Sequence, residues 1–200
     1  CDILEGKIKV KLDAEEVKKG VWIGSGTIIE PNAIINGPCL IGSNCRVGNG
    51  TVIDSFCVIG NNNVIEDDVS IKRSVIWNGS YIDYGSEIRG AILCNRVNFK
   101  QYVSAFEGTV IGDDCVIHSR AILKPKVKIW PQKIVDSLSI VDRNIIWGTR
   151  HSKTIFGESG LSGIINVDIS PEFATRLGAA YGSMFKKGAK VVVSSTRSNS

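Results

Sequence analysis

Few side chains in this sequence have the type and spacing that catalysis requires. His118 is one of two histidines in 200 residues, and a histidine can act as a general base towards a hydroxyl or an amine. Two histidines in all are too few for a three-histidine zinc site. The sequence contains no Ser-His-Asp set, no nucleotide P-loop and no metal-ligand cluster. His118 is therefore the catalytic candidate, and a surface or turn histidine is the simpler interpretation.

The C-terminal tail has groups that could hold a phosphate. Residues 194–200 offer serine and threonine hydroxyls, the Arg197 guanidinium and backbone amides. We therefore take Arg197 and Ser200 as phosphate- or substrate-binding candidates. The alternative is a polar, frayed terminus.

A six-residue repeat is the strongest pattern in the chain. Counting in sixes from Ile23 gives nine aliphatic residues in one register, and most residues four places after them are small. A short period of β-branched residues with Gly, Asn and Asp between them predicts short strands joined by tight turns. Three such strands would close one coil of eighteen residues. The aliphatic residues are Ile23, Ile29, Ile35, Ile41, Val47, Ile53, Ile59, Ile65 and Ile71.

This pattern resembles that of hexapeptide-repeat proteins, over about residues 21–134. The resemblance implies an all-β fold, a left-handed parallel β-helix of roughly six coils, in which Ile23, Ile41 and Ile59 stack. We expect the register to break after Ile71 and Trp77 and to resume in a shifted phase at Ile111. Residues 83–108 are predicted to continue the coils with an outward loop near 100–108, and Pro131 to end the ladder.

The cysteine pattern fits packing better than chemistry. Cys39, Cys45, Cys57 and Cys115 occupy the small inward position, where a free cysteine behaves as a compact buried hydrophobe. Cys39 and Cys57 are eighteen residues apart, so a disulfide between them stays open. Cys1 and Cys94 belong to no motif.

The chain changes character at both ends of the repeat. We expect residues 1–20 to form a strand and a connection from an upstream domain, and 135–152 a capping segment and linker. Ser170 and Pro171 predict a helix start, with an apolar stripe at Phe173, Leu177, Tyr181 and Phe185 and a helix end at residues 186–188. Residues 189–193 are predicted to form a buried strand, as at the beginning of an α/β layer.

Residues 155–200 resemble the first domain of the phosphohexomutases. FGESGLSG at 156–163 is similar to the family's opening motif, close to FGTSGIRG, and VVVSSTRSNS stands where the family has a strand and a loop. The resemblance implies that 153–200 begin an incomplete α/β domain and adds Ser159 and Gly160 to the phosphate-binding candidates; a simple linker is the alternative. Glu158, Ser162 and Ser195 depart from the family's threonine, arginine and aspartate.

A β-helix followed by a mutase-like region is similar to the layout of mannose-1-phosphate guanylyltransferase and phosphomannomutase fusions. The resemblance implies missing nucleotidyltransferase and mutase domains, an NTP and a sugar phosphate as substrates, and Mg²⁺ in the parent enzyme. For the fragment itself we expect no cofactor and no metal, and an assembly role with self-association. Two alternatives stay open: a hexapeptide acyltransferase with His118 as base, and a noncatalytic regulatory subunit similar to those of translation exchange factors.

Composition and charge bear on whether the chain is globular, binds nucleic acid or enters a membrane. With 43% hydrophobic and 22% charged residues the chain can bury a core. Its net charge of +4 is spread along the sequence, so we expect no nucleic-acid binding. No apolar run is long enough for a membrane helix and no secretory signal is visible, so we expect no membrane partner and a cytoplasmic location.

Overall fold

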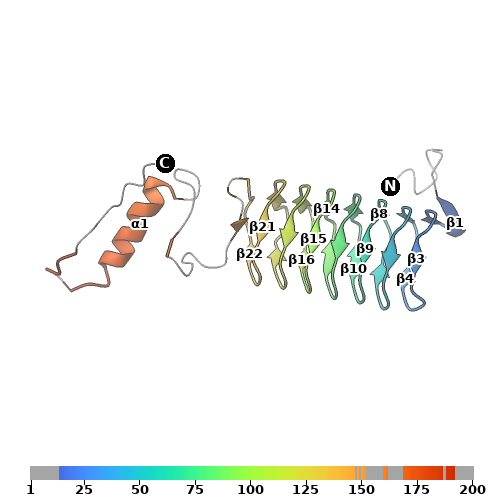
Figure 1. Ribbon diagram of the computed structural model, residues 1–200, viewed down its shortest axis with the longest axis horizontal. Helices are drawn as coiled ribbons and strands as arrows, with labels where there is room; N and C mark the ends of the chain where they lie inside the picture. Colours follow the sequence, from blue (N-terminus) through green and yellow to red (C-terminus); the bar gives the residue numbers. More distant parts are fainter. Residues whose placement is uncertain are drawn as a thin grey trace.

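The computed structural model describes residues 14–146, 148, 150–151, 160–161, 169–186 and 188–191. Figure 1 shows a long solenoid of short strands stacked along one axis, with a helix, α1, beyond its C-terminal end. The strands form three sheets, parallel except that β1 (Glu15–Lys18) pairs antiparallel with β2 (Val21–Ile23) at one edge, and the chain passes from sheet A to sheet B to sheet C in each coil. This is the predicted all-β, left-handed parallel β-helix.

Almost every strand is two or three residues long, since each side of the coil is only six residues wide. Sheet A contains β1 (Glu15–Lys18), β2 (Val21–Ile23), β5 (Cys39–Ile41), β8 (Cys57–Ile59), β11 (Val75–Ile76), β14 (Ile92–Leu93), β17 (Val110–Ile111) and β20 (Lys128–Ile129). Sheet B contains β3 (Ile28–Ile29), β6 (Arg46–Val47), β9 (Val64–Ile65), β12 (Tyr81–Ile82), β15 (Asn98–Phe99), β18 (Val116–Ile117), β21 (Ile134–Val135) and β23 (Arg150–His151). Sheet C contains β4 (Ile34–Ile35), β7 (Val52–Ile53), β10 (Ser70–Lys72), β13 (Glu87–Arg89), β16 (Ser104–Ala105), β19 (Ile122–Leu123) and β22 (Ile140–Val141).

The predicted stacking is confirmed in the strand register. Ile23 pairs with Ile41, and Ile41 pairs with Ile59, as neighbours in parallel strands. From Ile41 to Val141 the inward residues have at most 2% of their surface exposed. Ile23, by contrast, is only partly buried, because among the described residues the first coil has a neighbouring coil on one side only. A filled apolar interior is thus the main source of stability.

The shift of register has a simpler cause than the predicted outward loop. Ile76 follows Ile71 by five residues, and Leu93 follows Ile88 by five, whereas the other steps between inward residues are six. Both short steps lie at the corner from sheet C to sheet A. Residues 100–108 belong to a regular coil, so the expectation of a loop there was wrong. Each short corner drops one residue without disturbing the alternation of inward and outward side chains in the strands.

The solenoid also continues beyond Pro131. β21 pairs with β18, β22 pairs with β19, and Ile145 forms a bridge with Ile129. Seven inward residues in each sheet therefore give seven coils rather than six. Pro131 is harmless because it occupies the second corner position. Asn61 and Asn95 occupy the same position, and their backbone N–H groups donate to side chains of the next coil, Asn78 and Asp113, and not to its backbone. A proline there loses no hydrogen bond of the backbone ladder.

The helix α1 spans Pro171–Gly182. Ser170 is its N-cap, as predicted, and accepts a hydrogen bond from the Phe173 backbone N–H at 3.1 Å. The helix ends earlier than the predicted residues 186–188, because Gly182 and Ser183 are weak helix formers. Residues 188–191 form no strand, and Val191 is 56% exposed, so the predicted buried strand is not present in this described part.

Candidate functional site

His118 lies on the surface of the solenoid, at the corner from sheet B to sheet C. It directly follows the buried Ile117, and its backbone N–H donates to the Val135 carbonyl oxygen at 2.9 Å. Its side chain is partly buried. Lys100 and Asp136 occupy the same corner position one coil before and one coil after. This position leaves the imidazole accessible from outside, and its role as a general base stays a prediction.

The phosphate-binding candidates fall almost entirely outside the described residues. Ser159, Arg197 and Ser200 lie outside them. Gly160 is described and has a φ of 98°, a conformation that favours glycine. Among the described residues, its chain neighbours aside, no heavy atom lies within 4 Å of the position that a Cβ would take there. Gly160 is thus the one candidate of the four in the described part of the chain, and the phosphate site stays a prediction.

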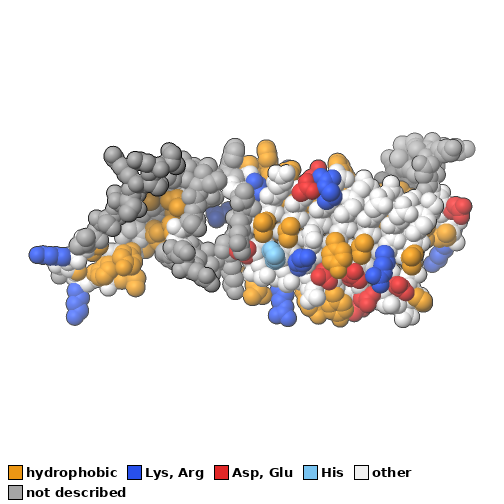
Figure 2. All heavy atoms as spheres, viewed as in Figure 1, with side chains coloured by type: hydrophobic (Ala, Val, Ile, Leu, Met, Phe, Trp, Pro, Cys, Tyr) orange, Lys and Arg blue, Asp and Glu red, His pale blue; other side chains and the backbone are white. Residues whose placement is uncertain are grey.

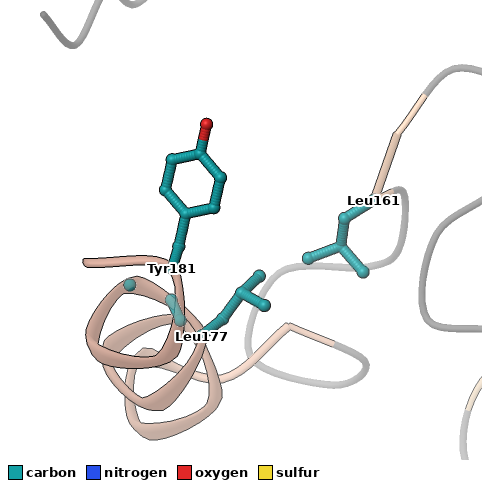
Figure 3. A pocket seen from close by; sticks show the side chains of 5 residues that line it. Leu161, Leu177 and Tyr181 are labelled. Atoms are coloured by element: carbon teal, nitrogen blue, oxygen red, sulfur yellow. The ribbon is translucent and has the colours of Figure 1, made fainter. Parts of the chain in front are cut away.

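One apolar face of the helix α1 borders a cavity. A cavity of about 340 Å³ is lined by Leu161 on one side and by Ala174, Leu177, Gly178 and Tyr181 of α1 on the other. Figure 3 shows Leu161 pointing towards Leu177 and Tyr181 across this space. The lining is apolar and contains no group that would hold a phosphate. It is a surface suited to packing.

The inward cysteines are structural. Cys39, Cys45, Cys57 and Cys115 are buried and free, so the open question of a Cys39–Cys57 disulfide is answered against it in this structure. Burial, and secondly the neighbouring Cys57, raises the pKa of the Cys39 thiol to about 11. Burial also raises the pKa of the Cys45, Cys57 and Cys115 thiols. Thiols that stay protonated at neutral pH are poor nucleophiles and poor metal ligands.

The outer corners carry ladders of polar and aromatic side chains that repeat from coil to coil. At the corner from sheet B to sheet C, the rings of Tyr84 and Tyr102 meet edge to face at 5.4 Å, and Arg120 lies 5.8 Å from the Tyr102 ring centre. At the corner from sheet A to sheet B, Arg96 donates to both carboxylate oxygens of Asp114, at 2.6 and 2.9 Å. This hydrogen bond is the main cause that lowers the pKa of Asp114. These contacts link coils on an exposed surface.

The three outward faces differ sharply in charge. Leaving aside the end strands β1 and β23, we compare on each face the outward residue of each coil strand and the first corner residue after it, which makes fourteen positions over seven coils. Sheet B and sheet C each present six Asp, Glu, Lys or Arg residues at these positions, whereas sheet A presents only Lys128. Figure 2 shows the mixture of acidic, basic and apolar side chains on one side of the solenoid.

The residues of the sheet A face are mostly apolar or glycine. In the strands they are Trp22, Leu40, Val58, Val75, Ile92, Val110 and Lys128, and at the following corner Gly24, Gly42, Gly60, Trp77, Cys94, Gly112 and Trp130. Trp77 is 47% exposed, Ile92 39% and Trp130 54%. The glycines account for much of the missing charge, because a Cβ at Gly24, Gly42, Gly60 or Gly112 would clash with atoms of the next coil.

No cluster of three or more His, Cys, Asp or Glu in the described ranges is placed to hold a metal ion. The Mg²⁺ that the family resemblance implies is therefore not matched by a donor set in the β-helix. Within the described helix no stretch has the length and apolarity needed to cross a membrane.

The geometry defines a hexapeptide-type β-helix, a solenoid whose interior is filled with apolar side chains. The family model of the EIF2B subunit epsilon LbH domain matches residues 18–123, more than half of the chain. The chain belongs to this family. The model of the phosphoglucomutase/phosphomannomutase α/β/α domain I matches residues 153–199 and supports the resemblance of that segment to the mutases.

Solved structures that are similar to this chain include LpxA and two proteins that are named as an acyltransferase and an acetyltransferase. LpxA from Acinetobacter baumannii is 18% identical, with 62% of this chain and 67% of that chain covered and a TM-score of 0.40. A UDP-N-acetylglucosamine acyltransferase from Francisella novicida is 15% identical, with 84% and 81% covered and a TM-score of 0.40. The acetyltransferase domain of PglB from Neisseria gonorrhoeae is 12% identical, with 65% and 53% covered and a TM-score of 0.28.

Proposed function

We propose that this β-helix holds subunits together and orders the catalytic domains of a sugar-1-phosphate nucleotidyltransferase fused to a phosphomannomutase-like domain. The observation that carries the proposal is the order of two family matches in one chain, an LbH domain at 18–123 and the start of a mutase domain at 153–199. A solenoid whose described interior is filled with apolar side chains supports the assembly role, since it offers rigid outer faces for contact.

The reaction of the parent enzyme is the transfer of a nucleotidyl group from an NTP to a sugar 1-phosphate. For GTP and mannose 1-phosphate, a sugar phosphate oxygen attacks the α-phosphorus, the bond from the α-phosphorus to the bridging oxygen breaks, and pyrophosphate leaves. GDP-mannose and pyrophosphate are then the products. Mg²⁺ would offset the negative charge of the phosphates in this reaction. We place it in the nucleotidyltransferase domain, because no group of three or more His, Cys, Asp or Glu in the described β-helix is arranged to hold a metal ion.

Two measurements test this proposal. The mass of the 200-residue chain in solution, determined by light scattering, is expected to exceed the 21.6 kDa of one copy. A strict monomer at high concentration would contradict the assembly role. In a protein that joins this chain to a nucleotidyltransferase domain, pyrophosphate release is expected only when GTP and mannose 1-phosphate are both present. Release without the sugar phosphate, or none at all, would contradict the enzymatic part.

A second candidate is a regulatory subunit of a translation-type exchange factor, which the EIF2B subunit epsilon match favours. It predicts binding to a guanine-nucleotide-binding protein and no dependence on sugar phosphates. The mutase-type match at 153–199 favours the first candidate, because phosphohexomutases and sugar-1-phosphate nucleotidyltransferases both act on sugar phosphates. The pyrophosphate assay and a nucleotide-exchange assay on the same preparation separate the two functions.

A further inference from the structure

The two ends of the solenoid differ in how well the apolar interior is covered. At the C-terminal end the inward residues Val135 and Val141 have 0% of their surface exposed. At the N-terminal end the inward residues of the first coil, Ile23, Ile29 and Ile35, are only partly buried. Repeat proteins need a capping segment where such an apolar end would otherwise meet water. Within the described part of the chain, the first coil lacks this cover.

The same end of the solenoid has free strand edges (Figure 1). Sheet A ends there at β1, whereas sheets B and C end at β3 and β4, with no further strand beside them among the described residues. The backbone N–H groups of Ile28 and Glu30 donate to the next coil, at 2.8 and 2.9 Å. Because successive residues of a strand direct their backbone groups to opposite sides, the N–H and C=O of Ile29 point to the open side. An edge of this kind is a template for one more strand.

The strand β1 brings the chain to this edge. It runs antiparallel to β2 with Glu15 opposite Ile23, so the chain before Glu15 lies at the corner that leads from sheet A to sheet B. The Glu16 carboxylate accepts a hydrogen bond from the Gly20 N–H at 2.7 Å, which helps to hold the connection between the two strands. Four residues separate Ile23 from β3. A similar number before Glu15 spans the same corner, and residues 7–10 then arrive beside β3.

The segment that would arrive there has the pattern of an edge strand. Residues 7–12 lie outside the described residues, and their sequence alternates basic and aliphatic side chains. They are Lys7, Ile8, Lys9, Val10, Lys11 and Leu12. In a strand this alternation puts the aliphatic residues on one face and the lysines on the other, and outward lysines protect an edge strand from further pairing. Glu30, directly after β3, is the only charged residue of the sequence between 21 and 38 and complements the lysines.

We propose that residues 7–12 form a strand that adds antiparallel to β3 and covers the open end of the solenoid on sheet B. Its aliphatic face points inward over Ile29, and its lysines point outward near the Glu30 carboxylate. An equal number of residues at the corner would place Lys9 opposite Ile29. A corner shorter by one residue, as before β11 and β14, places Val10 there, and the open apolar interior favours the aliphatic side chain. The inference does not depend on the function proposed above.

Hydrogen exchange of single backbone amides, followed by NMR on the full 200-residue chain, gives the direct readout. In the proposed pairing the Ile29 N–H donates to a carbonyl oxygen of residues 7–12 and exchanges slowly. The Ile35 N–H is an internal control, because its neighbours Ile34 and Asn36 donate to the next coil and it points to the open edge of β4, which the segment does not cover. The Ile35 amide is expected to exchange at least about tenfold faster than that of Ile29.

Two matched double variants test which face of the segment makes the contact. Ile8→Gln/Val10→Gln changes the aliphatic face and is expected to raise the exchange rate of the Ile29 amide at least about tenfold. Lys7→Gln/Lys9→Gln introduces the same side chains at neighbouring positions on the other face and is expected to change this rate less than about threefold. Far-ultraviolet circular dichroism checks that the solenoid is folded in both variants.

The amide exchange rates also show how the proposal can fail. It is overturned if the Ile29 and Ile35 amides of the unchanged chain exchange at the same rate. It is equally overturned if the two double variants have the same effect, because the aliphatic face would then not be the one in contact. Protection of Ile29 that is lost on dilution would mean that a second molecule covers the edge, and residues 7–12 would then not be its occupant.

Discussion

The fifth coil offers the sharpest test of how the solenoid interior is packed. Its inward residues are Leu93, Phe99 and Ala105, all with 0% of their surface exposed, whereas the coil before it has Ile76, Ile82 and Ile88. Phe99 is the largest side chain that is fully buried, and it shares its coil with one of the smallest. Because protein interiors are close-packed, the small Ala105 makes room for the large Phe99.

This interpretation predicts strong coupling between the two sites. Phe99→Ile removes buried atoms and is expected to lower the free energy of unfolding by about 1–2 kcal/mol. Ala105→Ile forces extra atoms into a filled interior and is expected to cost about 1–3 kcal/mol. The double variant gives two inward isoleucines, as at the same places in the preceding coil, so its cost is expected to be about 1–2 kcal/mol smaller than the sum of the single costs.

Urea unfolding followed by far-ultraviolet circular dichroism measures these differences through the transition midpoint, provided that the slope of the transition is unchanged. The matched control combines Phe99→Ile with Ile53→Val, a change in the second coil from the N-terminal end whose cost should simply add to that of Phe99→Ile. If the Phe99 and Ala105 costs also add, or the double variant is less stable than their sum, the two residues do not share space and the reasoning fails.

Two further predictions concern buried polar groups. The buried Asn63 amide donates to the carbonyl oxygens of Gly60 and Trp77 and accepts from the Ser80 N–H, so Asn63→Ala is expected to cost about 2–3 kcal/mol in urea unfolding, against less than about 1 kcal/mol for the exposed Asn61→Ala. The pKa of the Cys39 thiol is about 11 in the fold, above its usual 9.0, so the unfolded chain loses this proton first and binds fewer protons. The contribution of the protonated Cys39 thiol to the free energy of unfolding is therefore intact below pH 9.0 and falls by about 1.4 kcal/mol per pH unit as the pH rises towards 11. Cys39→Ala is expected to remove this part of the pH dependence. An alkaline profile identical in the two proteins would contradict the assignment.

The periodic part of the fold could be predicted from sequence because an aliphatic residue fills the same place in the apolar interior of each successive coil. The prediction failed at Ile76 and Leu93, where one residue is missing from a corner and a strict count in sixes loses the phase. Allowing one five-residue step at each of these two places recovers every inward residue up to Val141. The strict count also misses Phe99, because both short corners precede it and the phase is then two residues off.

Pro131 was misleading for a different reason. A proline in a strand removes a ladder hydrogen bond, but Pro31 and Pro125 occupy the same second corner position within the repeat, where no backbone ladder bond is lost. The repeat itself therefore held the information that proline is tolerated there. His118 could be chosen from sequence and the fold places it at a corner, but a general base also needs a bound acceptor. Ser159, Arg197 and Ser200 lie outside the described residues, so their role stays a prediction.

The two irregular corners lie in neighbouring coils. Both five-residue steps enter sheet A, one before β11 and one before β14, and these are the fourth and fifth of its seven parallel strands. Each corner loses one residue, yet the inward Ile76 and Leu93 that follow have only 1% and 0% of their surface exposed. The packed interior and the strand register are therefore kept, and the corner absorbs the missing residue. This is why the type of the inward residues is a more reliable guide to the coils than a strict six-residue count.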